Sequence, residues 1–320
     1  MRLIALLFLS SLALWGAKME KLIIAGPVAS VSHPFFHMIQ SGALNDVAKT
    51  VEFRLWNNPD ELRAILLKKE AHFVAIPTNV AANLYNRGVD IKLLDVSVWG
   101  ILEIISRDKN IQKIEDLRGK EIVVPFRADM PDIVLQALIR KAGLNPKKDF
   151  TIKYVSTPPD AMQMLIMRRA DHVLLAEPAT SMAMRKTGSF PLKLIAPQLH
   201  RSVNLQKEWG RLFKTDSKIP QAGVAVVGNV DPTVVKRFTQ EYGKSLAWYK
   251  SNPTKAGVLV ASKIDFFKPE AVADSIPHVV LEQRSALQSQ KELIEFFKIL
   301  YSIEPKLIGK KLPAEGFYYR

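Results

Sequence analysis

Charged side chains stand at the ends of predicted buried strands, where an α/β protein can bind a ligand. Arg127 follows the apolar run 122–125, and its planar guanidinium could clamp a carboxylate, sulfonate or phosphate. The alternative is that Arg127 forms only a surface ion pair with Asp129. Glu177 ends another apolar run, and it could accept hydrogen bonds from a ligand or cap its own helix. These residue types predict recognition of a bound molecule.

Two tryptophans, Trp56 and Trp99, are candidate aromatic walls for the same ligand. A buried tryptophan more often belongs to the hydrophobic core, so both roles stay open for each of them. Ligands of open α/β sheets lie beyond the carboxyl ends of the strands, beside helix N-termini whose free N–H groups favour anionic or acceptor-rich groups. The loops predicted at such positions add these candidate ligand-binding residues: Ala29, Ser30, Val31, Ser32, Asn57, Thr78, Asn79, Asp129 and Met130.

No set of residues has the spacing of a catalytic or metal site. His33 and His37 share one helical face, but a metal would need further ligands, and the chain has neither an HExxH motif nor any cysteine. There is also no GxSxG or GxGxxG motif and no histidine paired with a nucleophile. We therefore predict no catalytic residue, no metal and no cofactor, and a protein that is not an enzyme.

Two runs of alternating strands and helices position these residues. In the first run, strands are predicted at 22–25, 51–55 and 73–76, each followed by a helix. The first two helices have N-terminal capping signals, and the third ends at Gly88. In the second run, strands are predicted at 122–125, 151–155 and 172–176, again each followed by a helix. Short apolar strands in this order predict an α/β fold with parallel strands sandwiched by helices.

The two runs correspond at a distance of one hundred residues. Residues 57–69 align with residues 157–169 without a gap, and the register extends back to residues 21–24 and 121–124. Identities are few, so a chance alignment of two similar βα runs is an alternative, because such units have stereotyped lengths. Either interpretation gives two lobes of one architecture.

The chain must cross between these lobes twice. The β-rich segment 98–106 is predicted as the first crossing strand, and 223–227 as the return strand. Helices predicted around 231–250, 253–263 and 282–299 should then pack on the first lobe. The expected organisation is a signal segment at 1–17, a first lobe made of 18–105 and 215–320, and a second lobe at 106–214. Two crossings form a hinge that can close on a ligand.

The N-terminus has the pattern of an export signal. Arg2 precedes an apolar run at 3–15, which is shorter than the roughly 20 residues that span a bilayer. It ends in Gly16 and Ala17, so we predict a secretory signal peptide and a periplasmic protein, with an uncleaved membrane anchor as the alternative. The absence of cysteine predicts that the protein is not lipid-anchored and has no disulfide.

The composition is that of a globular protein with a strongly basic charge. The 320 residues are 48% hydrophobic and 24% charged, which is enough for two domains with cores. The formal net charge of +14 raises the question of nucleic-acid binding. The basic residues are dispersed, mostly as pairs near predicted helix ends, where cations favour the helix dipole. We expect no nucleic-acid partner, also because the protein is predicted to be exported.

Several segments resemble one family of proteins. Residues 116–124, with the sequence Asp-Leu-Arg-Gly-Lys-Glu-Ile-Val-Val, resemble the start of the second lobe in periplasmic substrate-binding proteins of ABC importers. The strand and Glu-Pro turn at 170–178 are similar to the sulfonate, nitrate and thiamine-pyrimidine branch, called NMT1/THI5-like. The loop and helix at 26–42 and the closing residues 316–319 also resemble this branch.

The resemblance implies a type II periplasmic binding protein fold. It further implies a monomer that captures a small molecule between its lobes and delivers it to the transmembrane subunits of an ABC permease. The ligand loops that it implies coincide with those named above. One departure concerns Ala29, Ser30 and Val31, because this loop lacks the glycine- and threonine-rich character often seen in sulfonate and nitrate binders. A larger aromatic or heterocyclic ligand is therefore at least as consistent with the sequence as a simple anion.

Two other functions remain open on the same fold. The first is an enzyme similar to pyrimidine synthases or chorismate dehydratases. The pyrimidine synthases use a cysteine-rich motif that this chain cannot have, and a chorismate dehydratase is not expected to carry a signal peptide. The second is a ligand sensor for a membrane receptor.

Overall fold

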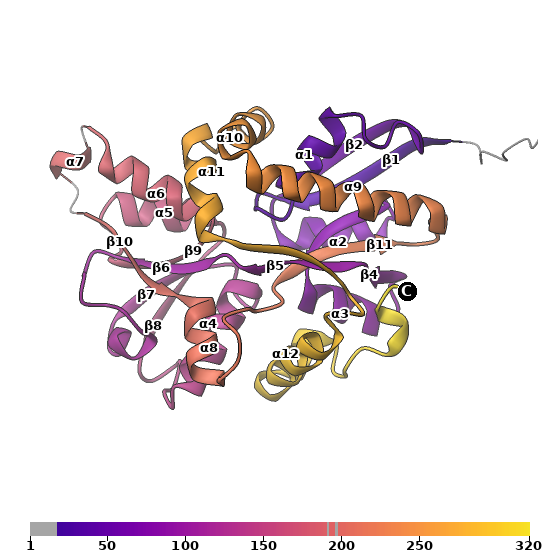
Figure 1. Ribbon diagram of the computed structural model, residues 1–320. Helices are drawn as coiled ribbons and strands as arrows, with labels where there is room; N and C mark the ends of the chain where they lie inside the picture. The colour runs from indigo at the N-terminus through magenta and orange to yellow at the C-terminus, as the bar shows by residue number, and fades with distance from the viewer. Residues whose placement is uncertain (1–17, 191, 196–197) are drawn as a thin grey trace, which may run out of the picture.

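The computed structural model describes residues 18–190, 192–195 and 198–320, which form two α/β lobes lying side by side (Figure 1). The predicted signal peptide, residues 1–17, lies outside the described residues. Each lobe is built around one sheet, and the predicted fold class is confirmed.

The sheet of the first lobe has the strand order β12–β5–β11–β3–β1–β2, and β4 pairs with β11. Strands β1, β2 and β3 are parallel, as predicted, and β2 forms one edge of the sheet. Strands β11 and β12 run antiparallel to their neighbours. The strands are β1 (Met19–Pro27), β2 (Ala48–Trp56), β3 (Phe73–Pro77), β4 (Ile91–Leu93), β5 (Asp95–Gly100), β11 (Ala222–Val227) and β12 (Val280–Ser285). The helices that follow β1, β2 and β3 are α1 (His33–Gln40), α2 (Pro59–Leu67) and α3 (Thr78–Asn86).

The sheet of the second lobe has the order β10–β6–β9–β7–β8. Strand β7 is parallel to both β8 and β9, and β6 is antiparallel to β9. The strands are β6 (Leu102–Ser106), β7 (Glu121–Pro125), β8 (Thr151–Val155), β9 (His172–Ala176) and β10 (His200–Asn204). The helices are α4 (Met130–Lys141), α5 (Pro158–Ile166), α6 (Ala179–Gly188), α7 (Leu192–Ile195) and α8 (Leu205–Phe213).

The hundred-residue correspondence reflects a shared topology. The order β2–β1–β3 in the first sheet matches β8–β7–β9 in the second, and each set is continued by an antiparallel strand. The helix starts also correspond: the side chain of Asn58 caps α2, and that of Thr157 caps α5. Both lobes therefore direct the carboxyl ends of three parallel strands toward equivalent loops.

The two crossings lie against each other. The segment predicted as one crossing strand is two strands, β5 in the first sheet and β6 in the second, separated at Ile101. The return segment pairs with it, because the Ile219 and Gln221 N–H groups donate to the Trp99 and Val98 carbonyls at 2.8 and 3.0 Å. The side-chain Oε1 of Gln221 also accepts the Ile101 N–H at 3.2 Å. These hydrogen bonds join the crossings into one hinge.

The C-terminal region departs from the prediction at one element. Helices α9 (Pro232–Ser251) and α10 (Pro253–Ala261) occur where they were expected, and a short α11 (Pro269–Ser275) follows. The helix predicted at 282–299 was wrong in its first part, because residues 280–285 form β12 and α12 spans Gln290–Ile303. Tertiary pairing explains the difference: β12 supplies the edge of β5 with hydrogen bonds, which overrides local helix preference.

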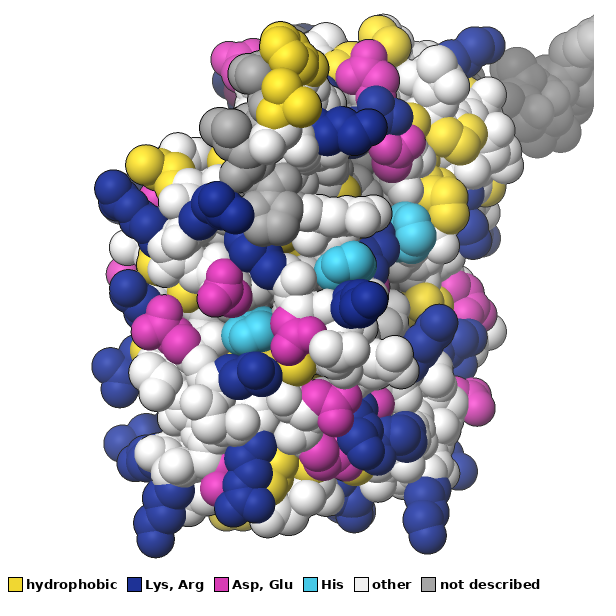
Figure 2. Space-filling view, turned by 90° about the vertical axis from the view of Figure 1, so that its left-hand side faces the viewer, with side chains coloured by type: hydrophobic (Ala, Val, Ile, Leu, Met, Phe, Trp, Pro, Cys, Tyr) yellow, Lys and Arg dark blue, Asp and Glu magenta, His cyan; other side chains and the backbone are white. Residues whose placement is uncertain are grey.

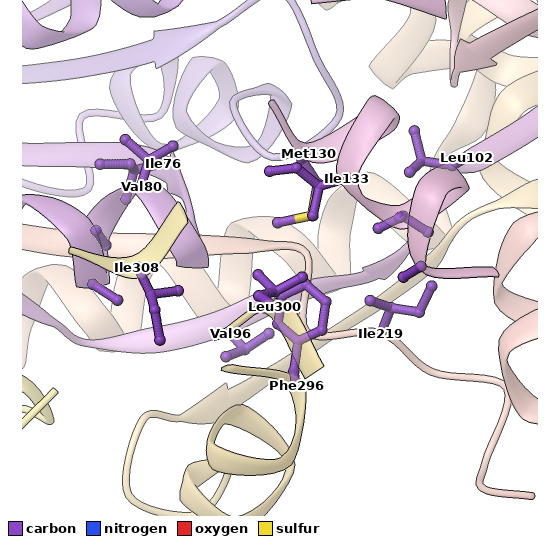
Figure 3. Packing of buried hydrophobic residues seen from close by; sticks show 14 of the residues in the cluster. Ile76, Val80, Val96, Leu102, Met130, Ile133, Ile219, Phe296, Leu300 and Ile308 are labelled. Carbon is purple, nitrogen blue, oxygen red and sulfur yellow. The ribbon is translucent and has the colours of Figure 1, made fainter. Parts of the chain in front are cut away.

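The expectation that the C-terminal helices pack on the first lobe holds only in part. Helix α12 also contacts α4 and α8 of the second lobe, where the rings of Phe296 and Trp209 lie 5.7 Å apart. Figure 3 shows Met130 and Ile133 of α4 beside Leu300 and Phe296 of α12 within one buried cluster. Helix α11 in turn packs against α6. The C-terminal helices therefore join the lobes on both sides of the hinge.

Candidate functional site

A chamber of about 290 Å³ lies between the lobes, at the carboxyl ends of their central strands. Both crossings border it, the first at Ile101 and Leu102 and the return crossing at Gln221 and Ala222. Because parallel strands in both sheets end here, the loops after β1, β2, β7 and β9 meet in one place. The position agrees with the one predicted from the strand order.

The chamber brings seven of the thirteen sequence-predicted site residues together. Trp56 and Asn57 follow β2, Asp129 and Met130 begin α4, and Glu177 follows β9. Ala29 and Val31 of the loop between β1 and α1 complete this set.

The other predicted residues occupy different places. Ser30 is buried, and its hydroxyl donates to the Glu177 carbonyl at 3.2 Å, so it joins the two lobes. The Thr78 hydroxyl donates to the Pro220 carbonyl at 2.5 Å and thereby fastens α3 to the return crossing. The side chain of Ser32 is buried and does not border the chamber. These three residues support the loops around the chamber.

Trp99 belongs to the core, which is one of the two roles that the sequence left open. Its side chain is fully buried, and its indole N–H donates to the Glu282 carbonyl at 2.8 Å. The guanidinium of Arg284 stacks 3.8 Å from the centre of its ring. Strand β12 therefore holds Trp99, and the residue does not border the chamber.

Glu177 is held by a buried ionic cluster. An Arg201 Nη1 lies 2.6 Å from its carboxylate, and the same arginine pairs with Glu103 and donates to the Ser181 hydroxyl. The Ser181 N–H and O–H both donate to the Glu177 carboxylate, so Glu177 also caps α6. Burial raises the pKa of Glu177, and Arg201 and these hydrogen bonds act against the rise. Its oxygens are thus used within the protein, as in the second of the two predicted roles.

Asp129 also borders the chamber, and its carboxylate has fewer partners within the protein than that of Glu177. Its Oδ1 accepts only the adjacent Met130 N–H, at 2.8 Å, and its side chain N-caps α4. Burial raises the pKa of Asp129, partly offset by its hydrogen bond and by Arg63, which lies outside the chamber lining. This carboxylate can accept a further hydrogen bond from a molecule in the chamber.

Arg127 faces a second, wider cavity of about 820 Å³ that shares Phe126 and Asp129 with the chamber. Its guanidinium lies 5.3 Å from the centre of the Tyr154 ring, a cation–π distance. Asn79 of α3 lies on the same outer cavity. The structure therefore places both residues outside the chamber lining. An anion clamp, one of the two predicted roles of Arg127, would act in the outer cavity and not in the chamber.

Sequence reasoning missed several residues that border the chamber. Phe266 and Phe267, in the connection between α10 and α11, close it from the C-terminal side. Gln221 lies on the return crossing. The two adjacent phenylalanines could have been predicted as site residues, because two apolar rings in a short connection between helices are expected to pack against another surface of the protein. Gln221 could have been found from its place just before the return strand.

The histidines with helical spacing have separate environments. His33 is buried, and its Nδ1 lies 2.9 Å from the Tyr249 hydroxyl. His37 stacks on Trp248, with ring centres 4.0 Å apart. Among the residues that the structure describes, no group of three or more His, Asp or Glu side chains is arranged to hold a metal ion.

The surface charge is mixed at the end of the second lobe (Figure 2). Figure 2 shows lysines and arginines dispersed over the end of the second lobe, with acidic side chains and histidines between them. Within the described ranges, none of the helices combines the length and the apolar character needed to cross a membrane.

The two lobes, the double crossing and the chamber define a type II periplasmic binding protein fold, and solved structures with this fold are similar over most of the chain. An ABC transporter protein from Parabacteroides distasonis matches with a TM-score of 0.78 and 21% identity, over 94% of this chain and 99% of that one. The aliphatic sulphonate binding protein SsuA from Escherichia coli matches with a TM-score of 0.66 and 14% identity, over 94% and 96%. The nitrate-binding protein NrtA from Synechocystis gives 0.63 and 12%, over 80% and 69%.

A family model identifies the sequence relationship more narrowly. Residues 103–256 match the model described as NMT1/THI5 like, which confirms the family resemblance predicted from the sequence. The matched region begins at the first crossing and runs through the second lobe into α10. No curated protein matches the sequence.

Proposed function

We propose that this protein is the solute-binding component of an ABC importer, exported to the periplasm as a monomer. It would hold one small organic molecule between its lobes and present it to the transmembrane subunits of the permease. The observation that carries the proposal is the chamber itself. It lies where both sheets end, it is bordered by both crossings, and it is bounded mainly by apolar and aromatic side chains.

The proposal includes the division of the chain expected from the sequence. The sequence predicts residues 18–105 with 215–320 as one body, residues 106–214 as the other, and removal of residues 1–17 on export. Because β6 (Leu102–Ser106) pairs within the second sheet, we propose that it moves with the second body and that the first segment of the first body ends at Ile101. The hinge would open to admit the ligand and close around it. No cofactor would take part. The alternatives are an enzyme on the same fold, which a test for chemical turnover separates from a binding protein, and a ligand sensor for a membrane receptor.

Mass spectrometry of the protein purified without denaturation is expected to detect a retained small molecule. Binding to the folded state alone stabilises a protein, so removal of this molecule should lower the melting temperature and its return should restore it. Incubation of the molecule with the protein should leave its mass unchanged. Chemical turnover by the purified protein would contradict the binding role and favour the enzyme.

Replacing Arg127 by alanine is expected to change the affinity for the retained molecule by no more than about fivefold, because an exposed charge contact contributes up to about 1 kcal/mol. The reason is its place on the outer cavity rather than on the chamber. Trp56→Ala is the matched control, and it should weaken binding strongly because Trp56 borders the chamber. Calorimetric titration of both variants measures the difference. A large loss with Arg127→Ala and none with Trp56→Ala would place the ligand in the outer cavity.

A further inference from the structure

Two residues that border the chamber each carry a buried hydrogen-bond donor with no partner among the described residues. Trp56 is 5% exposed, and its indole Nε1–H makes no hydrogen bond. Gln221 is 1% exposed, and its Nε2 likewise has none, although its Oε1 accepts the Ile101 N–H. Both side chains border the chamber. Buried donors are almost always paired in native proteins, because an unpaired donor has lost its hydrogen bonds to water.

The charged side chains around the chamber disfavour an anionic ligand. Among the described residues that border it, none is a lysine, arginine or histidine, whereas Asp129 and Glu177 are carboxylic acids. The nearest arginine to Glu177 is already bound to two carboxylates. An anionic group in the chamber would thus be buried without a cation and close to acidic oxygens, which is strongly unfavourable.

The aromatic side chains that border the chamber favour a ligand with a flat ring. Trp56, Phe126, Phe266 and Phe267 provide aromatic faces and edges around a space of about 290 Å³. Flat rings pack on such side chains with large burial of apolar area. The polar groups are few and lie within this apolar wall, which is the usual arrangement for fixing the orientation of a small ligand.

We propose that the chamber is specific for a small uncharged ring compound with two hydrogen-bond acceptors, which bind the indole N–H of Trp56 and the side-chain amide of Gln221. A ring N–H donating to Asp129 would complete the set. Gln221 has a second role in this arrangement. Gln221 lies on the return crossing, and its Oε1 accepts the Ile101 N–H of the first crossing. A ligand bound to its Nε2 would therefore be linked to both crossings. The inference rests on the proposed function, because it names the ligand class of the same chamber.

Three compounds of similar size test the ligand class. Phthalimide has two carbonyl acceptors and one N–H, indane is its hydrocarbon counterpart without polar atoms, and benzenesulfonate is an anion. Titration calorimetry at neutral pH, with protein freed of any retained molecule, is expected to show phthalimide binding at least about tenfold more tightly than indane, as expected for filling buried unpaired donors. Benzenesulfonate should not bind.

Gln221→Glu removes the Nε2 donor and keeps Oε1 for the Ile101 N–H, but it also places an ionisable carboxyl group at a buried position, so a control with the same change of charge is needed. Phthalimide affinity should fall about tenfold or more, while indane affinity stays the same. Gln206→Glu is the matched control: Gln206 is also buried, and its Oε1 accepts the Leu102 N–H at 3.4 Å, but it does not border the chamber. Trp56→Phe provides a second test, since it keeps an aromatic ring and removes the N–H.

The outcomes separate this inference from the proposed function. Binding of benzenesulfonate without phthalimide would overturn the ligand class and leave the solute-binding role intact. Equal affinity for phthalimide and indane would overturn the role of the two donors, as would unchanged phthalimide affinity in both Gln221→Glu and Trp56→Phe. If no compound binds and mass spectrometry finds no retained molecule, both the inference and the proposed function are contradicted.

Discussion

Replacing Arg201 by methionine is expected to lower the free energy of unfolding by about 3–5 kcal/mol, the range measured when one partner of a buried ion pair is removed. Arg201 is the cation between Glu177 and Glu103, whose side chains are 1% and 11% exposed. Without it, two buried carboxylates would face each other at the boundary of the chamber, and the pKa of Glu177, already raised by burial, would rise further. Urea unfolding at neutral pH measures the effect.

Two comparisons decide whether charge or packing causes this loss. Adding Glu177→Gln to Arg201→Met should recover a large part of it, because glutamine carries no charge and can still accept the Ser181 N–H. Arg185→Met is the control at an exposed pair, since Arg185 and Asp274 are 47% and 44% exposed and join α6 to α11. That variant should lose no more than about 1 kcal/mol. Similar losses for Arg201→Met with and without Glu177→Gln would refute the charge explanation.

The stability difference between the native protein and His33→Asn is expected to depend on pH. Burial lowers the pKa of His33 from 6.5 to about 3, so between these values the unfolded chain binds a proton that the folded chain does not. This contribution lowers the stability of the native protein as the pH falls below 6.5. From there to about pH 4.5, the native protein should lose about 2–3 kcal/mol relative to the variant.

The comparison between the two proteins is needed because another buried group acts in the opposite direction. Burial raises the pKa of Asp95 to about 7, so this group stabilises the folded protein as the pH falls. Both proteins contain Asp95, and its effect cancels in the difference. Asparagine can keep a hydrogen bond to the Tyr249 hydroxyl, which limits the loss at neutral pH. A pH-independent difference in chemical unfolding would mean that His33 is not held neutral by burial.

The local pattern of the sequence was sufficient for most of the elements. Strands β1, β3, β7 and β9 were predicted because each is a short apolar run that becomes buried on both faces of a sheet. Helices α2 and α5 were predicted from their capping residues and prolines. These signals lie within a few residues of each other, so they need no information about the rest of the chain.

Prediction failed where long-range pairing decides the structure. The segment 98–106 reads as one strand, but its halves pair with different sheets, and only the meeting of the crossings places the break at Ile101. Strand β12 overlaps the start of a segment that was predicted as a helix, and it is a strand because it pairs with the edge of β5. The partner of Glu177 could not be found either, because Arg201 is 24 residues away and reaches it only through β10.

The sequence by itself determined two α/β lobes, their shared strand and helix order, and the loops at which a ligand would be expected. Periodicity, caps and prolines act locally, and parallel strands must end at one edge of a sheet. Only the tertiary structure decided which loop residues border the chamber. It placed Trp56 and Asp129 there, moved Arg127 to the outer cavity, and buried Trp99 under Arg284. The physical reason is that the direction of a side chain depends on the neighbours it packs against, and those neighbours come from distant parts of the chain.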